Sequence, residues 1–244
     1  MSDVIVKELD NVKIVVLSEQ GDNHKKNGIC NQDSYAFKVD NSGNYAFVVA
    51  DGVGSCIFAK EGADKACEAV CDILSDCIDL SEDEIKQKIF LKWKSLIGKD
   101  WNDYGTTINF LYVYPERTVM GKIGDGSVIM KNGANVFFLA EESEFYTAET
   151  FAFGSSIYKH SFRVFSMHYD VTVPILLVLL TDGIEKELNP EKRREFLDYI
   201  DSAINNKNFV VELKNWILSL NNKNGDDKTI IICEIEGREK NGRT

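Results

Sequence analysis

The stretch Tyr45-Ala-Phe-Val-Val-Ala-Asp51-Gly52 is a run of apolar residues that ends on a carboxylate and a glycine. Such a run is typical of a buried β-strand followed by a turn. A second stretch, Ile175-Leu-Leu-Val-Leu-Leu-Thr-Asp182-Gly183, has the same form. If the two strands end at the same edge of the fold, Asp51 and Asp182 lie together at one mouth of a sheet.

Three other acidic turns adjoin predicted strands: Asn31-Gln-Asp33, Gly124-Asp125-Gly126 and Gly225-Asp226-Asp227. Asp and Gly are common turn residues, so each turn alone favours a simple structural role. Together the turns predict several converging carboxylates, which repel one another unless divalent cations lie between them. A glycine beside each acid also allows close backbone approach, so that a carbonyl oxygen can serve as a further ligand.

Hydrophobic periodicity extends outward from these strands and predicts the order of the elements. Short strands, a helical pair, a long run of strands, a second helical pair and a last strand follow one another along the chain. A capping box at Ser81 and Glu84 begins the second helix, Asn132-Gly133 predicts a hairpin, and Asn189-Pro190 precedes the later helices. This order favours antiparallel α+β layering over a parallel sheet. We expect a single domain over residues 1–236 and a polar tail over 237–244.

Composition excludes several classes of protein. The chain has 244 residues, with 28 Lys and Arg against 39 Asp and Glu, a net charge of −11. Nucleic-acid binders and anionic-membrane binders need clustered positive charge, so neither partner is expected. No signal peptide is evident, and the apolar run 173–180 is far shorter than the roughly 20 residues of a membrane-spanning helix. Six cysteines without a paired spacing favour a reducing, cytoplasmic location.

The acidic blocks, in this order, resemble the PPM family, the metal-dependent type-2C Ser/Thr protein phosphatases, and most of all its bacterial branch. The matching blocks are Asn31-Gln-Asp-Ser-Tyr35, Phe47-Val-Val-Ala-Asp-Gly-Val-Gly-Ser55, Gly105-Thr-Thr107, Ile123-Gly-Asp-Gly-Ser127, Leu180-Thr-Asp-Gly-Ile184 and Asp226-Asp-Lys-Thr229. The resemblance implies a four-layer αββα sandwich, in which two antiparallel β-sheets are flanked by helix pairs.

The resemblance also assigns roles to residues. It implies that Asp51 bridges two Mn²⁺ or Mg²⁺ ions and that the Gly52 carbonyl binds the second. Asp182 and Asp226 complete the ligands of the first ion, and Asp33 holds metal-bound water. Asp125, with Asp182, matches a place where bacterial members bind a third ion.

The function implied is hydrolysis of phosphoserine and phosphothreonine in proteins, opposing a Ser/Thr kinase. Two cations would lower the pKa of a shared water, which attacks phosphorus in line with the leaving group. The catalytic residues expected are Asp33, Asp51, Asp182 and Asp226, and we expect the protein to be a monomer.

Two positions depart from the usual family pattern and leave alternatives open. Gln32 replaces an acidic residue, and Gly28 occupies the place of an Arg that grips the substrate phosphate. His24 and Lys25 could take over that grip, or belong to a solvated loop. An alternative function is a catalytically impaired regulatory or phosphoprotein-binding module. Another two-metal hydrolase, such as a nuclease, is disfavoured because the chain lacks a basic stripe with interleaved aromatic residues.

Overall fold

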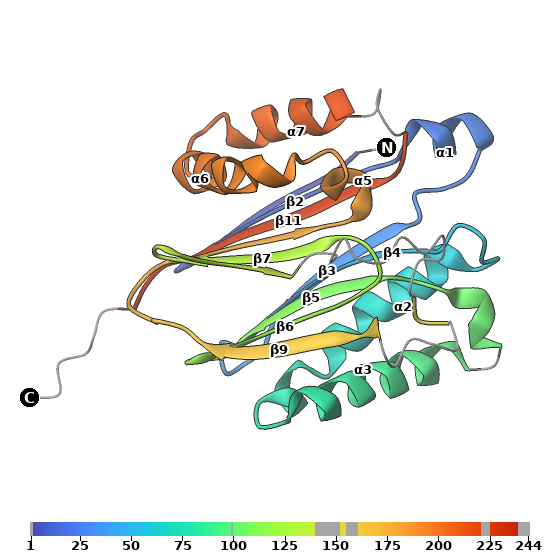
Figure 1. The fold of residues 1–244 in the computed structure, drawn as a ribbon, viewed down its shortest axis with the longest axis horizontal. Helices are drawn as coiled ribbons and strands as arrows, with labels where there is room; N and C mark the ends of the chain where they lie inside the picture. The colour runs from blue at the N-terminus through green and yellow to red at the C-terminus, as the bar shows by residue number, and fades with distance from the viewer. Residues whose placement is uncertain (1, 99, 140–151, 155–160, 221–224, 239–244) are drawn as a thin grey trace, which may run out of the picture.

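The structure is a computed structural model that describes residues 2–98, 100–139, 152–154, 161–220 and 225–238. Two antiparallel β-sheets pack face to face, and each is covered on its outer side by helices (Figure 1). The expected four-layer α+β sandwich is confirmed.

The first sheet has six strands in the spatial order β1-β2-β11-β10-β7-β8. Their bounds are β1 Asp3–Leu9, β2 Val12–Glu19, β11 Lys228–Ile235, β10 Ile175–Leu180, β7 Ser127–Asn132 and β8 Asn135–Leu139. The second sheet has five strands in the order β3-β4-β5-β6-β9. Their bounds are β3 Asp33–Val39, β4 Tyr45–Asp51, β5 Ile108–Val113, β6 Arg117–Ile123 and β9 Arg163–His168.

Side-chain alternation along the strands builds three apolar layers. On β4, Phe47 and Val49 point toward the other sheet, whereas Val48 points toward the helices. Strand β10 alternates in the same way between the inter-sheet layer and the layer under the other helix pair. Because successive residues of a strand face opposite sides, Asp51 continues the inter-sheet row of Phe47 and Val49 at the end of β4.

One helix pair covers each sheet. Helices α2 (Ala59–Asp72) and α3 (Glu82–Ile97) pack on the second sheet, and α6 (Arg193–Ala203) and α7 (Phe209–Leu220) pack on the first. The predicted capping box is present, since the Glu84 carboxylate accepts a hydrogen bond from the Ser81 backbone N–H at 2.9 Å. Two short helices, α1 (Asp22–Asn27) and α5 (Asp182–Glu185), lie at the end of the sandwich where β4 and β10 end (Figure 1).

Two local features differ from the expectation for physical reasons. Strand β1 was not predicted, because it is an edge strand whose residues are mostly exposed and show little alternation. Helix α1 was not predicted because its six residues are polar, with none buried. The expected cap is present: Asn189 precedes a 3₁₀ turn, Pro190–Lys192, and α6 begins at Arg193.

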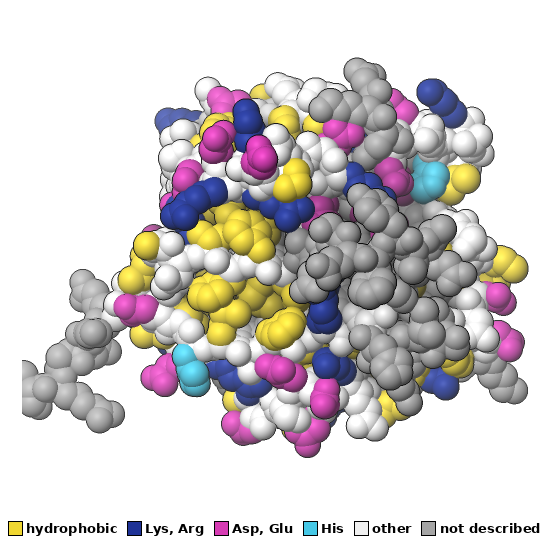
Figure 2. All heavy atoms as spheres, viewed as in Figure 1, with side chains coloured by type: hydrophobic (Ala, Val, Ile, Leu, Met, Phe, Trp, Pro, Cys, Tyr) yellow, Lys and Arg dark blue, Asp and Glu magenta, His cyan; other side chains and the backbone are white. Residues whose placement is uncertain are grey.

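Figure 2 shows hydrophobic side chains gathered on one visible face of the molecule. Among the exposed hydrophobic residues are Phe138 on β8 and Phe165 on β9, which are 43% and 48% exposed. Among the described residues, no helix is both long enough and apolar enough to cross a membrane.

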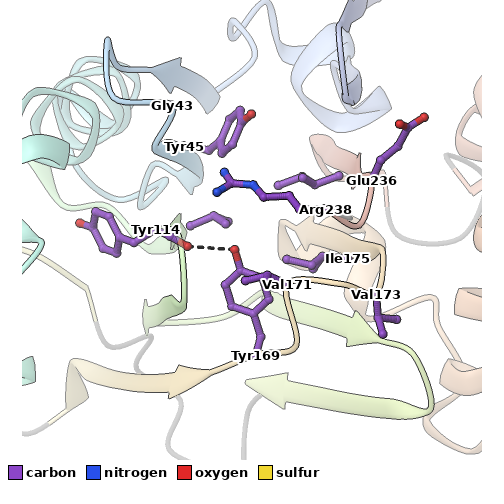
Figure 3. Close-up of a pocket in the computed structure, with 11 residues that line it drawn as sticks. Gly43, Tyr45, Tyr114, Tyr169, Val171, Val173, Ile175, Glu236 and Arg238 are labelled. Atoms are coloured by element: carbon purple, nitrogen blue, oxygen red, sulfur yellow. Dashed lines mark hydrogen bonds between the residues drawn. The ribbon is translucent and has the colours of Figure 1, made fainter. Parts of the chain in front are cut away.

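The end of the sandwich opposite the acidic turns is closed. A cavity of about 10 Å³, room for about one water molecule, lies where β4 and β10 begin, and Arg238 extends into it beside Tyr45 (Figure 3). Tyr169 donates a hydrogen bond to the Tyr114 carbonyl at 2.9 Å, and the Arg238 N–H donates to the Val171 carbonyl at 2.7 Å. The first residues of the expected tail therefore pack on the domain, and 239–244 lie outside the described residues.

Candidate metal centre

The second sheet contributes two carboxylates that are direct neighbours. Asp33 begins β3 and Asp51 ends β4, and the antiparallel register pairs one with the other. Both lie on the side of the sheet that faces the first sheet, since they share the alternation of Tyr35 and Val49. The antiparallel pairing therefore brings together two acids that are 18 positions apart in the chain.

The first sheet meets this pair through a threonine. The Thr181 hydroxyl, at the end of β10, donates a hydrogen bond to Asp33 Oδ2 at 2.8 Å. The same hydroxyl oxygen accepts the backbone N–H of Thr229 at 2.9 Å. Thr181 thus links β10 and β11 of one sheet to the first residue of β3 in the other, and it fixes the orientation of the Asp33 carboxylate.

The turns that carry Asp182 and Asp226 are brought together by close packing of their backbones. Asp182 begins the single turn of α5, and Gly183 lies directly against the chain that follows Asp226. A Cβ atom at Gly183 would stand 1.9 Å from the Asp227 carbonyl oxygen, so only glycine allows this approach. The Asp-Gly pair after β10 is therefore needed for packing as well as for its carboxylate.

Asp227, next to Asp226, has a structural role that sequence reasoning missed. Its carboxylate accepts hydrogen bonds from the backbone N–H groups of Gly21 and Gln32, at 2.7 and 2.6 Å. It also pairs with His24 Nδ1 at 2.7 Å. The signal was present, because Asp227 belongs to the quoted Asp226-Asp-Lys-Thr229 block, but only the structure shows which neighbours it binds.

The converging carboxylates perturb one another strongly. Burial and the charges of Asp227 and Asp182 together raise the pKa of Asp33 to about 8, against the hydrogen bonds from Thr229 and Thr181, which lower it. Burial also raises the pKa of Asp51 well above its usual value, and the charges of Asp33, Asp182, Asp226 and Asp227 add to this. The pKa of Asp226 is raised by burial and by Asp182. Asp33, Asp51, Asp182 and Asp226 therefore lie close enough to share one negative field.

Lys186 is a second residue that sequence reasoning missed. Its ammonium Nζ lies 2.5 Å from Asp182 Oδ2 and 3.8 Å from Asp125 Oδ2. Burial lowers the pKa of Lys186, but the hydrogen bond and charge of Asp182 outweigh it and raise the pKa to about 12. Asp125 itself lies on the connection from β6 to β7, where Asn109 donates a hydrogen bond to its carbonyl at 2.9 Å.

The donor set fits divalent cations in its chemistry. Carboxylate and carbonyl oxygens are the ligands that Mg²⁺ and Mn²⁺ prefer. Asp33 Oδ1 is buried and has no hydrogen-bond partner among the described residues. Buried polar atoms are normally paired, so this oxygen fits contact with a bound ion or its water. A Cβ at Gly52 would lie 2.4 Å from the Ala59 carbonyl oxygen, so the backbone after Asp51 is also closely packed.

The side chains do not yet form a closed coordination shell. Within the described parts of the chain, no three His, Cys, Asp or Glu side chains are grouped as they would be around a metal ion.

The two cationic candidates for the substrate phosphate lie on α1. His24 is held beside the acidic cluster by Asp227. Lys25 points instead to β2, where its ammonium lies 2.6 Å from Glu19. Gly28 ends α1 with φ of 68°, a left-handed conformation that favours glycine. The phosphate-binding role of His24 and Lys25 stays a prediction.

Comparisons with known proteins place this geometry in a family. The sequence profile described as "Protein phosphatase 2C" matches residues 20–218. No curated protein sequence matches the chain. The fold is similar to that of solved structures at low sequence identity.

The structure of RsbX in complex with magnesium has 17% identity and a TM-score of 0.63, covering 96% of this chain and 100% of that one. The S. agalactiae serine/threonine phosphatase has 16% identity and a TM-score of 0.63, covering 92% and 100%. The catalytic domain of PstP, in complex with two manganese ions, has 15% identity and a TM-score of 0.61, covering 93% and 99%. Since the family profile matches most of the chain, this protein belongs to the protein phosphatase 2C family.

Proposed function

We propose that this protein is a metal-dependent phosphatase that hydrolyses phosphoserine and phosphothreonine in proteins. The observation that carries the proposal is the convergence of Asp33, Asp51, Asp182 and Asp226 from two sheets into one negative field. Two bound divalent ions would supply an activated water and offset the negative charge on the phosphoryl oxygens. The magnesium and manganese complexes of RsbX and PstP support this choice of ions.

The chain's own residues divide the work. Asp51, Asp182 and Asp226, with the Gly52 carbonyl, would hold the ions. Asp33, fixed by Thr181, would orient the attacking water by accepting its proton in a hydrogen bond. The surrounding apolar layer between the sheets excludes bulk water on the inner side of the acids, which strengthens their electrostatic interactions.

His24 is the side chain best placed to contact the substrate phosphate. Its Nδ1 is bound to Asp227, so the ring is oriented and Nε2 remains as the other polar atom. Lys25 contributes at longer range through the positive charge of α1. A kinase that phosphorylates the same substrate, a monomeric state and a cytoplasmic location all remain predictions.

The test is hydrolysis of p-nitrophenyl phosphate and of phosphoserine and phosphothreonine peptides, with Mn²⁺ and with EDTA. We expect Mn²⁺-dependent turnover that EDTA abolishes. Asp51→Asn and Asp182→Asn should each reduce turnover at least about 100-fold, the scale of removing one key electrostatic group. The matched control is Asp198→Asn, an exposed acid on α6 that should leave turnover unchanged. Undiminished turnover in either site variant would refute the assignment.

One observation favours a second candidate function, a catalytically impaired module that binds phosphoproteins. The Lys186 ammonium already occupies one oxygen of Asp182, a predicted metal ligand. This candidate predicts phosphopeptide binding without turnover, even at saturating Mn²⁺. Turnover of the same peptides would exclude it. The buried acids argue against it, because unpaired buried charges destabilise a fold that has no cation to bind.

A further inference from the structure

Lys186 and Asp182 occupy one face of a single helical turn. Asp182 begins α5 and Lys186 follows four residues later, a spacing that places both side chains on the same side. The ammonium reaches back over the turn to Asp182 Oδ2 at 2.5 Å. The Lys186 side chain is 58% exposed, whereas that of Asp182 is 9% exposed. A mostly exposed lysine side chain therefore places its ammonium group against a mostly buried carboxylate.

The same ammonium also faces a carboxylate from a distant part of the chain. Asp125, on the β6–β7 connection, places its Oδ2 3.8 Å from Lys186 Nζ, and its side chain is 19% exposed. Asp125 and Asp182 are therefore two poorly solvated carboxylates that converge on one point. Such a pair needs a cation between its members, and the chain supplies the cation itself.

We propose that the Lys186 ammonium takes the place of a divalent ion between Asp125 and Asp182, so that this protein works with two bound metal ions and no third. This inference rests on the proposed function. An ion bound to both oxygens at the usual distance of about 2.0–2.2 Å would lie within about 5 Å of the ammonium, where like charges repel. Lys186 contacts Oδ2 of Asp182, so Oδ1 would remain for the ions that Asp51 and Asp226 would hold.

A tethered ammonium differs from a metal ion in a way that matters for regulation. It carries one charge instead of two, is present at every metal concentration, and EDTA cannot remove it. The charge between Asp125 and Asp182 is therefore constant in this protein. Only the ions at Asp51 and Asp226 respond to the metal supply.

The test counts Mn²⁺ bound per chain by equilibrium dialysis, with no activity measurement needed. We expect Lys186→Met to bind one Mn²⁺ more than wild type, because removal of the ammonium frees two carboxylates. The double variant Lys186→Met with Asp125→Asn should return to the wild-type number. Lys186→Arg, which keeps the charge, should bind as wild type does.

The matched control is Lys131→Met. Lys131 also bridges two carboxylates, Asp198 and Asp201, both at 2.8 Å, but on the outer side of the first sheet. Its loss should leave the Mn²⁺ count unchanged. An unchanged count in Lys186→Met would overturn the inference, as would a wild-type ion that Asp125→Asn removes. If the wild type binds no Mn²⁺ at all, the proposed function itself fails, which is a separate outcome.

Discussion

Asp33 and Asp51 stand directly opposite each other in the antiparallel pair of strands β3 and β4. Like charges in this position normally destabilise a sheet. Here burial adds to the repulsion, and the pKa of both carboxyl groups is raised. Without a cation the pair is stable only when it holds protons, so the stability of the domain should depend on both pH and metal.

The first prediction concerns the pH dependence of the metal-free protein. The pKa of Asp33 rises from an ordinary value of 3.8 to about 8 on folding, so the folded state binds more protons than the unfolded state between these limits. Stability therefore falls as pH rises from about 4 to about 8. Thermal unfolding in EDTA should show a falling midpoint over this window. Mn²⁺ should flatten the slope, and so should Asp33→Asn. A midpoint in EDTA that rises with pH from 5 to 8 would contradict this account.

The second prediction concerns the threonine that joins the two sheets. Thr181→Val keeps the shape but leaves Asp33 Oδ2 and the Thr229 N–H without their shared partner. We expect a loss of about 1–3 kcal/mol in the free energy of unfolding. For a domain of this size each kcal/mol lowers the unfolding midpoint by about 2–4 °C. Thr172→Val, at a half-buried threonine whose hydroxyl makes an exposed hydrogen bond to Asp170, is the control and should change little. Equal midpoints for the two variants would show that the link carries no stability.

The third prediction tests the close packing of the two acidic turns. Gly183→Ala places a methyl group 1.9 Å from the Asp227 carbonyl oxygen, so the α5 turn must shift away from Asp226. We expect Mn²⁺ affinity to fall at least about tenfold, because ligands on the two turns no longer converge. Isothermal titration calorimetry measures this directly. Gly54→Ala adds the same methyl group where its nearest neighbour is 3.6 Å away, and should bind Mn²⁺ as wild type does.

The fourth prediction separates binding of the substrate phosphate from chemistry. His24→Ala combined with Lys25→Ala should raise KM for a phosphopeptide several-fold and lower kcat less, because the cations act on substrate binding. Lys26→Ala, on the same short helix, is the control for net charge. The His24 substitution also removes the His24–Asp227 pair and could destabilise the fold. Unfolding midpoints are therefore measured for all variants, so that an effect on stability is told apart from an effect on substrate binding. An unchanged KM would show that other residues bind the substrate phosphate.

Much of the fold could be predicted from the sequence because it follows from local patterns. The apolar runs 45–50 and 175–180 predict two buried strands that end on acids, and the capping box at Ser81 marks the start of α3. These signals depend on neighbouring residues alone. Strand β1 and helix α1 lack them, because β1 is a mostly exposed edge strand and α1 is polar with no buried residue.

The contacts within the candidate site were decided by the tertiary structure. The sequence by itself determined that acids end several strands, but the pairing of Asp33 with Asp51 depends on the register of β3 against β4. The contact of Lys186 with Asp125 joins two chain segments from different parts of the fold. Such contacts are set by how sheets and turns pack, which no local pattern encodes. Residue types therefore indicated the chemistry, and packing determined which charges meet.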